Sequence, residues 1–297
     1  MLPDGDAAAR RRFAAYADPV EGMRGYIAWS VDSRLAGRSP EKSWSRFDGY
    51  PAASADRLAF NRDFWALDVD FSCVSPWNDR FRSQRAGTAV SPVHVVFANH
   101  FQLSPGTRVY FVGTDGKLYY RRYLAGLRVG ETDLMVGLLD SPLPPAVRPA
   151  AILPDDYAAY IGNADKLPVV TFDQKERALV QELWPISTAP ESNGMSSRNL
   201  KFSSGWHSVG AAVPEPPELA EARERRARFY DHLVKGDSGN PCFLLVGREP
   251  ILLYTVFSGG PGAGPALQKL RVQLQNAMDR LRPGYTLRTF DFSALFD

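Results

Sequence analysis

Ser238 is the residue of this 297-residue chain whose type and setting first suggest chemistry. It lies in the stretch KGDSGNP, which consists mainly of turn-forming residues. A serine hydroxyl is a weak nucleophile, and it needs a general base within hydrogen-bond reach and a third group that orients the base. It also needs N–H donors directed at the oxyanion that forms during acyl transfer. Taken alone, KGDSGNP is better explained as a surface turn. A catalytic role for Ser238 therefore depends on whether the chain also supplies a suitable base and an orienting carboxylate.

The candidate bases are the four histidines of the chain: His94, His100, His207 and His232. All four precede Ser238, which excludes the serine–aspartate–histidine order of an α/β-hydrolase. The G-x-S-x-G elbow of that class is also absent, because Asn240 stands at its second glycine. His100 ends the apolar stretch VVFANH, where a structural histidine at a strand end is the competing interpretation. We interpret His94 and His207 as structural.

Asp133 is the candidate for the orienting carboxylate. It precedes the apolar run LMVGLL, and burying an aspartate there is costly unless it has a partner. Asp115 and Asp140 are competing carboxylates in turns. The residues alone leave Asp133 either a member of a catalytic set or an ordinary turn residue.

Together, three stretches resemble the trypsin/chymotrypsin-like serine proteases. They are GTAVSPVHVVFANH, TDLMVGLL and GDSGNP, and they occur in the order found in that family. The resemblance extends over residues 63–297. It implies that Ser238 is the nucleophile, that His100 is the general base and then the acid, and that Asp133 orients His100. It also implies an oxyanion hole formed by the backbone N–H groups of Gly236 and Ser238.

The chain departs from this family in three places. Asn240 replaces the second glycine of GDSGGP, and asparagine tolerates left-handed backbone geometry well. Phe101 stands where the family usually has cysteine, and the partner cysteine is missing too. No activating Ile-Val-Gly-Gly sequence occurs whose new amino group would pair with Asp237. We therefore expect a constitutively formed site supported by the N-terminal residues, with cleavage between Arg57 and Leu58 as the alternative.

The resemblance also places a specificity pocket, with its base in YDHLVKG and its wall in TVFSGGPG. The residues assigned to this pocket are His232, Leu233, Lys235, Ser258, Gly259 and Gly260. No aspartate matches the base position cleanly, because Asp231 is displaced by one residue. A preference for arginine or lysine is therefore not expected. His232, with Lys235 nearby, leads to the hypothesis that an acidic substrate residue is favoured.

The elements that must position these residues read as short strands separated by turns. This pattern fits the stretches 63–74, 87–101, 107–112, 117–129, 133–139, 167–173, 176–186, 241–246 and 250–257. The turn 114–116 predicts a hairpin. Strands of this kind indicate an all-β barrel or sandwich protein. The family resemblance implies a more specific fold, which consists of two six-stranded antiparallel β-barrels over residues 63–150 and 151–297. A Pro-rich segment, 141–154, links them.

Three other segments do not fit the strand pattern. Residues 264–284 predict a helix near the C-terminus, since a leucine and methionine stripe follows Pro265 and Pro283-Gly284 ends it. Residues 216–230 are helical in character, and we interpret their charges as a solvated face. Residues 1–62 are expected to be an extension that packs on the main domain or covers it. There Asp6 is the expected cap of a short helix that Pro19 stops, before the polar residues 29–57.

Composition limits the classes of partner. Hydrophobic residues make up 44% of the chain, which is enough for a real core, and the net charge of +2 gives no electrostatic reason for a nucleic-acid or anionic-membrane partner. Cys73 and Cys242 are expected to be buried and reduced, and no zinc-ligand spacing occurs. The expected partner is a protein or peptide substrate, and no cofactor is expected. The compartment stays open.

The resulting expectation is an active serine endopeptidase. Two alternatives remain at this stage: a binding module on an inactive protease fold, and a hydrolase of small esters that shares the same chemistry. The intact set of His100, Asp133 and Ser238 favours activity.

Overall fold

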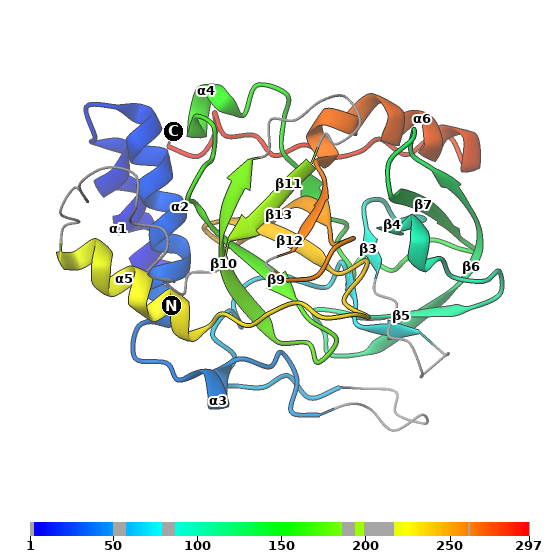
Figure 1. The fold of residues 1–297 in the computed structure, drawn as a ribbon, viewed down its shortest axis with the longest axis horizontal. Coiled ribbons are helices and arrows are strands. Elements are labelled where there is room, and N and C mark those ends of the chain that lie inside the picture. Colours follow the sequence, from blue (N-terminus) through cyan, green and yellow to red (C-terminus); the bar gives the residue numbers. More distant parts are fainter. Residues whose placement is uncertain are drawn as a thin grey trace.

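The structure is a computed structural model that describes residues 3–49, 58–78, 87–185, 194–198, 217–260 and 262–296. The chain is mostly β, and its helices are few and short. Figure 1 shows the two sheets next to each other, with α1, α2 and α5 beside the second sheet and α6 above the first.

The first sheet is a nearly closed antiparallel barrel. Its strands are β1 (Val74–Ser75), β2 (Trp77–Asn78), β3 (Gly87–Ala89), β4 (His94–Ala98), β5 (Arg108–Val112), β6 (Leu118–Arg128) and β7 (Leu134–Leu139). They lie in the order β1-β3-β4-β7-β6-β5-β2. β1 and β2 are the two end strands in this order; they are separated only by Pro76, and they pair with β3 and β5. Counted as one bent strand, this segment makes a six-strand barrel, and β5 and β6 form the predicted hairpin.

The second sheet is mixed. Its strands are β8 (Ala151–Ile152), β9 (Pro168–Phe172), β10 (Ala178–Pro185), β11 (Gly194–Arg198), β12 (Pro241–Val246), β13 (Glu249–Thr255) and β14 (Ala263–Pro265). They lie in the order β14-β11-β10-β9-β12-β13-β8. β8 pairs in parallel with β13, whereas the other pairs are antiparallel. The expected second antiparallel barrel is therefore not confirmed for the residues described.

The helices are α1 (Pro3–Ala14), α2 (Pro19–Leu35), α3 (Pro40–Ser43), α4 (Ala158–Ile161), α5 (Pro217–Arg228) and α6 (Arg271–Leu281). α6 confirms the helix predicted near the C-terminus. α1 begins before Asp6, so this residue is not its cap; the Asp6 carboxylate instead accepts the Tyr26 hydroxyl at 2.6 Å. Asp18 caps α2, since its side chain accepts the Val20 N–H at 2.8 Å. None of the helices among these residues is long and apolar enough to cross a membrane.

α2 places part of the N-terminal region in the core. The sequence did not predict this helix, which extends into residues 29–57, the segment described as polar. Tyr26, Ile27, Val31 and Leu35 are fully buried. They belong to one continuous cluster of buried side chains that reaches both sheets. α2 packs against β12 and β9 of the second sheet. The sequence of this segment is polar in part because the buried face of α2 also carries Arg34. The Arg34 Nε donates to the Asp68 carboxylate at 2.8 Å, which compensates the buried charge.

Residues 63–73 form turns rather than the strand that their alternating pattern predicted. Their inward side chains instead anchor an irregular segment in the core. Phe71 contacts Phe172 of β9 edge-on, with ring centroids 4.9 Å apart. Trp65 donates its indole N–H to the backbone oxygen of Ala178 at 3.1 Å. The two cysteines, Cys73 and Cys242, are buried and free, as expected.

Candidate active site

The register of the first barrel brings His100 and Asp133 together. His100 lies in a single 3-10 turn, Asn99–Phe101, directly after β4. Asp133 lies directly before β7, the strand that pairs with β4 through Ala98 and Leu134. The ladder continues one step beyond the strands, because Asn99 N–H donates to the Asp133 backbone oxygen at 3.0 Å. Residues far apart in sequence thereby become neighbours at one end of the barrel.

The three predicted residues form a continuous chain of hydrogen bonds. His100 Nδ1 lies 2.5 Å from Asp133 Oδ2, and Asp133 Oδ1 accepts the His100 backbone N–H at 2.8 Å. His100 Nε2 lies 2.9 Å from Ser238 Oγ. One carboxylate oxygen thus binds the imidazole and the other binds the backbone of His100, and the ring lies with Nε2 toward the serine. The His100 side chain is 47% exposed, so the serine–histidine pair is accessible to a substrate.

The loop 236–240 leaves two backbone N–H groups available. The N–H groups of Asp237, Gly239 and Asn240 donate to Val234, Val256 and Asp237 oxygens at 2.7–3.0 Å. Within the part of the chain that the structure describes, the N–H groups of Gly236 and Ser238 donate to no acceptor. These are the two groups that the family resemblance implies for an oxyanion hole. Gly236 has a φ of +108°, which only glycine adopts readily.

Asp237 is buried and satisfied by neutral donors. Its carboxylate accepts the backbone N–H groups of Val234 at 2.5 Å and Gln174 at 2.9 Å. The Asn240 side-chain amide approaches it at 3.4 Å. Burial raises the pKa of Asp237, and the two backbone donors oppose this shift. Two backbone N–H groups and the Asn240 amide thus satisfy the carboxylate for which the family resemblance implied an amino group as partner.

The comparisons with known proteins give no family. A scan against models of protein families finds no match, and no curated protein matches the chain. Any assignment of function therefore depends on the geometry of the site and on the motifs themselves.

The two segments predicted to form the specificity pocket lie side by side. Leu233 and Gly260 exchange two backbone hydrogen bonds of 3.0 and 2.9 Å. A side chain at Gly259 would lie 2.9 Å from the Leu233 oxygen, so the contact requires glycine there. His232, Lys235 and Ser258 are exposed.

His232 and its neighbour Asp231 make separate contacts. His232 Nδ1 lies 2.9 Å from the Tyr230 hydroxyl. The Asp231 carboxylate binds Arg177 at 2.9 Å. Asp231 is therefore engaged with Arg177. The preference for an acidic substrate residue stays a prediction.

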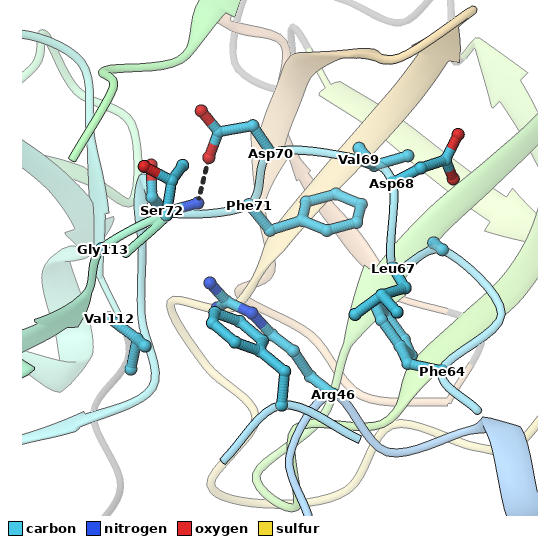
Figure 2. Close-up of a pocket in the computed structure, with 13 residues that line it drawn as sticks. Arg46, Phe64, Leu67, Asp68, Val69, Asp70, Phe71, Ser72, Val112 and Gly113 are labelled. Atoms are coloured by element: carbon cyan, nitrogen blue, oxygen red, sulfur yellow. Dashed lines mark hydrogen bonds between the residues drawn. The ribbon is translucent and has the colours of Figure 1, made fainter. Parts of the chain in front are cut away.

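A cavity of about 300 Å³ lies away from these residues (Figure 2). Arg46, Phe64, Asp70 and Phe71 are among its lining residues, and none of the lining residues belongs to the predicted site. Figure 2 shows the Asp70 carboxylate accepting the Ser72 N–H, a bond of 2.9 Å. The buried Arg46 guanidinium lies 3.7 Å from Glu176. This cavity gives no support to a small-ester pocket around Ser238.

Of the other histidines, His94 is structural and His207 lies outside the described residues. His94 is fully buried on β4, and its Nδ1 lies 2.7 Å from Ser91 Oγ. That oxygen already accepts the N–H groups of Val93 and His94, so its own proton is directed at Nδ1. Burial lowers the pKa of His94, and its neutral form fits the site.

His94 is expected to make folding stability depend on pH. The unfolded chain binds a proton near pH 6.5 but the folded chain only at lower pH, so stability falls as pH decreases below about 6.5. Each unit of pKa depression corresponds to about 1.4 kcal/mol. Denaturant unfolding of wild type and His94→Gln between pH 7.5 and 5 checks this. On acidification, the free energy of unfolding of wild type should fall more than that of His94→Gln. A difference between the two that does not change with pH would contradict the prediction.

The sequence did not indicate Gln174. It lies in the turn 173–177 between β9 and β10, its backbone N–H donates to Asp237, and its side chain donates to the backbone oxygen of Lys235. Nothing in TFDQKERA marks this glutamine as different from any turn residue. The one available signal was indirect, because Asp237 lacked an evident cationic partner.

Proposed function

We propose that this chain is a serine endopeptidase of the trypsin/chymotrypsin-like type, with a fold of two β-barrels and a triad of His100, Asp133 and Ser238. The observation that carries the proposal is the hydrogen-bond chain from Asp133 through His100 to Ser238, with distances of 2.5 and 2.9 Å. It is the arrangement that activates a serine hydroxyl for acyl transfer. The available N–H groups of Gly236 and Ser238 next to it support the same reaction.

In the first half of the reaction, Ser238 Oγ attacks the carbonyl carbon of the scissile peptide while its proton passes to His100 Nε2. The carbonyl oxygen becomes an oxyanion, which the N–H groups of Gly236 and Ser238 would bind. Asp133 stabilises the imidazolium and keeps Nε2 directed at the reacting atoms. His100 then gives the proton to the leaving amine, the C–N bond breaks, and an acyl-Ser238 ester remains.

In the second half, His100 takes a proton from a water molecule as the water oxygen attacks the ester carbonyl carbon. The same two N–H groups bind the second oxyanion. When the C–O bond to Ser238 breaks, the proton returns from His100 to Ser238 Oγ and the carboxylic acid product leaves. Nothing in this cycle requires a metal or an organic cofactor.

Labelling with a fluorophosphonate probe tests the proposal, because the probe reacts with an activated serine by the same attack. Wild type is expected to gain one covalent adduct at Ser238, and Ser238→Ala none, as read by intact-protein mass spectrometry. Ser141→Ala, an exposed serine in a loop, is the matched control and should label like wild type. Equal labelling of wild type and Ser238→Ala, or labelling of neither, counts against the assignment.

A peptide library then separates an endopeptidase from an esterase and reads the specificity. Cleavage of internal peptide bonds is expected, with the residue before the bond giving the preference. Hydrolysis of small esters without any peptide cleavage would favour the esterase alternative. Strong preference for arginine or lysine would exclude the hypothesis that His232 and Lys235 select an acidic residue.

A further inference from the structure

We propose that Gln174 is a positioning residue that fixes the peptide unit between Lys235 and Gly236, and thereby keeps the Gly236 N–H directed toward the reacting carbonyl. This inference rests on the function proposed above and adds a residue outside the triad and the oxyanion loop. Gln174 belongs to the turn 173–177 of the second sheet.

The side chain of Gln174 holds this peptide unit from one side. Its Nε2 donates to the Lys235 backbone oxygen at 3.0 Å. Its amide also covers the Cα of Gly236, because a Cβ placed there would lie 2.5 Å from Nε2 and 2.6 Å from Oε1. The amide of Gln174 therefore both binds the carbonyl and occupies the space beside the glycine.

The direction of the Gly236 N–H follows from the planarity of the peptide bond. In a trans peptide unit the C=O and the N–H point in opposite directions, and the described residues contain no cis bond. Since the Lys235 C=O points at Gln174, the Gly236 N–H points away from it. Glycine permits several backbone conformations here, so without the anchor this unit is free to rotate.

A second bond from the same residue stabilises the other side of Gly236. The Gln174 backbone N–H donates to Asp237 Oδ1 at 2.9 Å. The loop is thus held by Gln174 at Lys235 and at Asp237, with Gly236 between them.

The turn that carries Gln174 is itself well anchored. Asp173 Oδ1 accepts the backbone N–H groups of Lys175 and Arg177, both at 2.9 Å. The Glu176 backbone oxygen accepts the Arg46 N–H at 2.9 Å, which ties the turn to the N-terminal region. Gln174 therefore acts from a support whose position does not depend on the oxyanion loop.

Gln174→Met tests the donor, because methionine has a similar length and no N–H group. We expect kcat for a peptide substrate to fall about 10²-fold, the effect of losing one oxyanion donor. KM should change less than about threefold, since ground-state binding is untouched. Lys175→Met is the matched control: it alters an exposed side chain of the same turn and should retain wild-type kcat. Thermal unfolding checks that both variants fold like wild type.

A tetrahedral adduct separates positioning from a merely structural role. A peptide trifluoromethyl ketone bonds its carbonyl carbon to Ser238 Oγ and leaves an oxyanion in the hole. Its affinity for Gln174→Met is expected to fall by the same factor as kcat, whereas a non-covalent product peptide should bind unchanged. Wild-type kcat in the variant, or lost kcat with unchanged ketone affinity, overturns the inference.

Separate measurements test the proposed function and the role of Gln174. If wild type does not react with the fluorophosphonate, the proposed function fails. Crystal structures of wild type and Gln174→Met then still decide the positioning role. We expect the Lys235–Gly236 peptide unit to be turned in the variant, and an unchanged carbonyl direction overturns the inference.

Discussion

Replacing Asp133 with asparagine is expected to lower kcat for peptide hydrolysis about 10⁴-fold while the protein stays folded. The Asp133 carboxylate accepts the proton on His100 Nδ1, which leaves Nε2 unprotonated and able to take the proton of Ser238. Asparagine keeps an oxygen for the His100 backbone N–H but presents an N–H group to Nδ1. The imidazole then carries its proton on Nε2, the tautomer that cannot act as the base. Steady-state kinetics with circular dichroism measures this result.

Asp140→Asn is the control for the Asp133 prediction. Asp140 is an exposed carboxylate that follows β7, the strand that Asp133 precedes, and its side chain accepts the Ser141 hydroxyl at 3.2 Å. Its replacement should leave kcat within about twofold of wild type, as for surface substitutions away from the site. Retention of more than a tenth of the wild-type kcat in Asp133→Asn would show that this carboxylate does not orient the base.

The second large effect concerns stability, and it comes from α2. Asp32→Ala is expected to destabilise the fold by about 3–5 kcal/mol, because it leaves the buried guanidinium of Arg226 without its partner. Arg226 donates to both Asp32 oxygens at 2.6 Å, and its side chain is only 3% exposed. Denaturant unfolding with linear extrapolation measures the change.

Two further variants make the stability prediction specific. Glu21→Ala removes another acidic residue of the same helix, but this carboxylate is 65% exposed and lies 3.7 Å from Arg24. Its loss should cost less than about 1 kcal/mol. The double variant Asp32→Leu with Arg226→Leu removes both charges and should recover much of the stability lost in Asp32→Ala. Equal destabilisation by Asp32→Ala and Glu21→Ala would show that the buried pair is not important.

The three residues of the candidate triad could be found from the sequence because each lies in a short motif whose order along the chain restricts the alternatives. His100 and Asp133 each adjoin an apolar strand, and strand pairing is what brings them together. The β5–β6 hairpin and α6 were predictable for a similar reason, since turn residues and a stripe of apolar side chains are local signals.

The remaining features depend on contacts that no local pattern reveals. α2 was missed because Ser30 and Arg34 lie on its buried face, so its apolar stripe is interrupted. The charges of α5 were interpreted as a solvated face, whereas Arg226 is buried against Asp32 of α2. Residues 63–73 alternate like a strand, but their aromatic side chains pack as an irregular segment against the second sheet.

The closure of the first barrel by β1 and β2 also bears on self-association. An open sheet exposes a row of unpaired N–H and C=O groups at which another chain can add a strand. Here one short segment around Pro76 supplies both end strands of the first sheet, β1 and β2, which pair with β3 and β5. The end strands of the second sheet, β14 and β8, have three and two residues. In the part of the chain that the structure describes, both sheets thus end in strands of two or three residues, and short end strands are one means by which proteins limit edge-to-edge pairing.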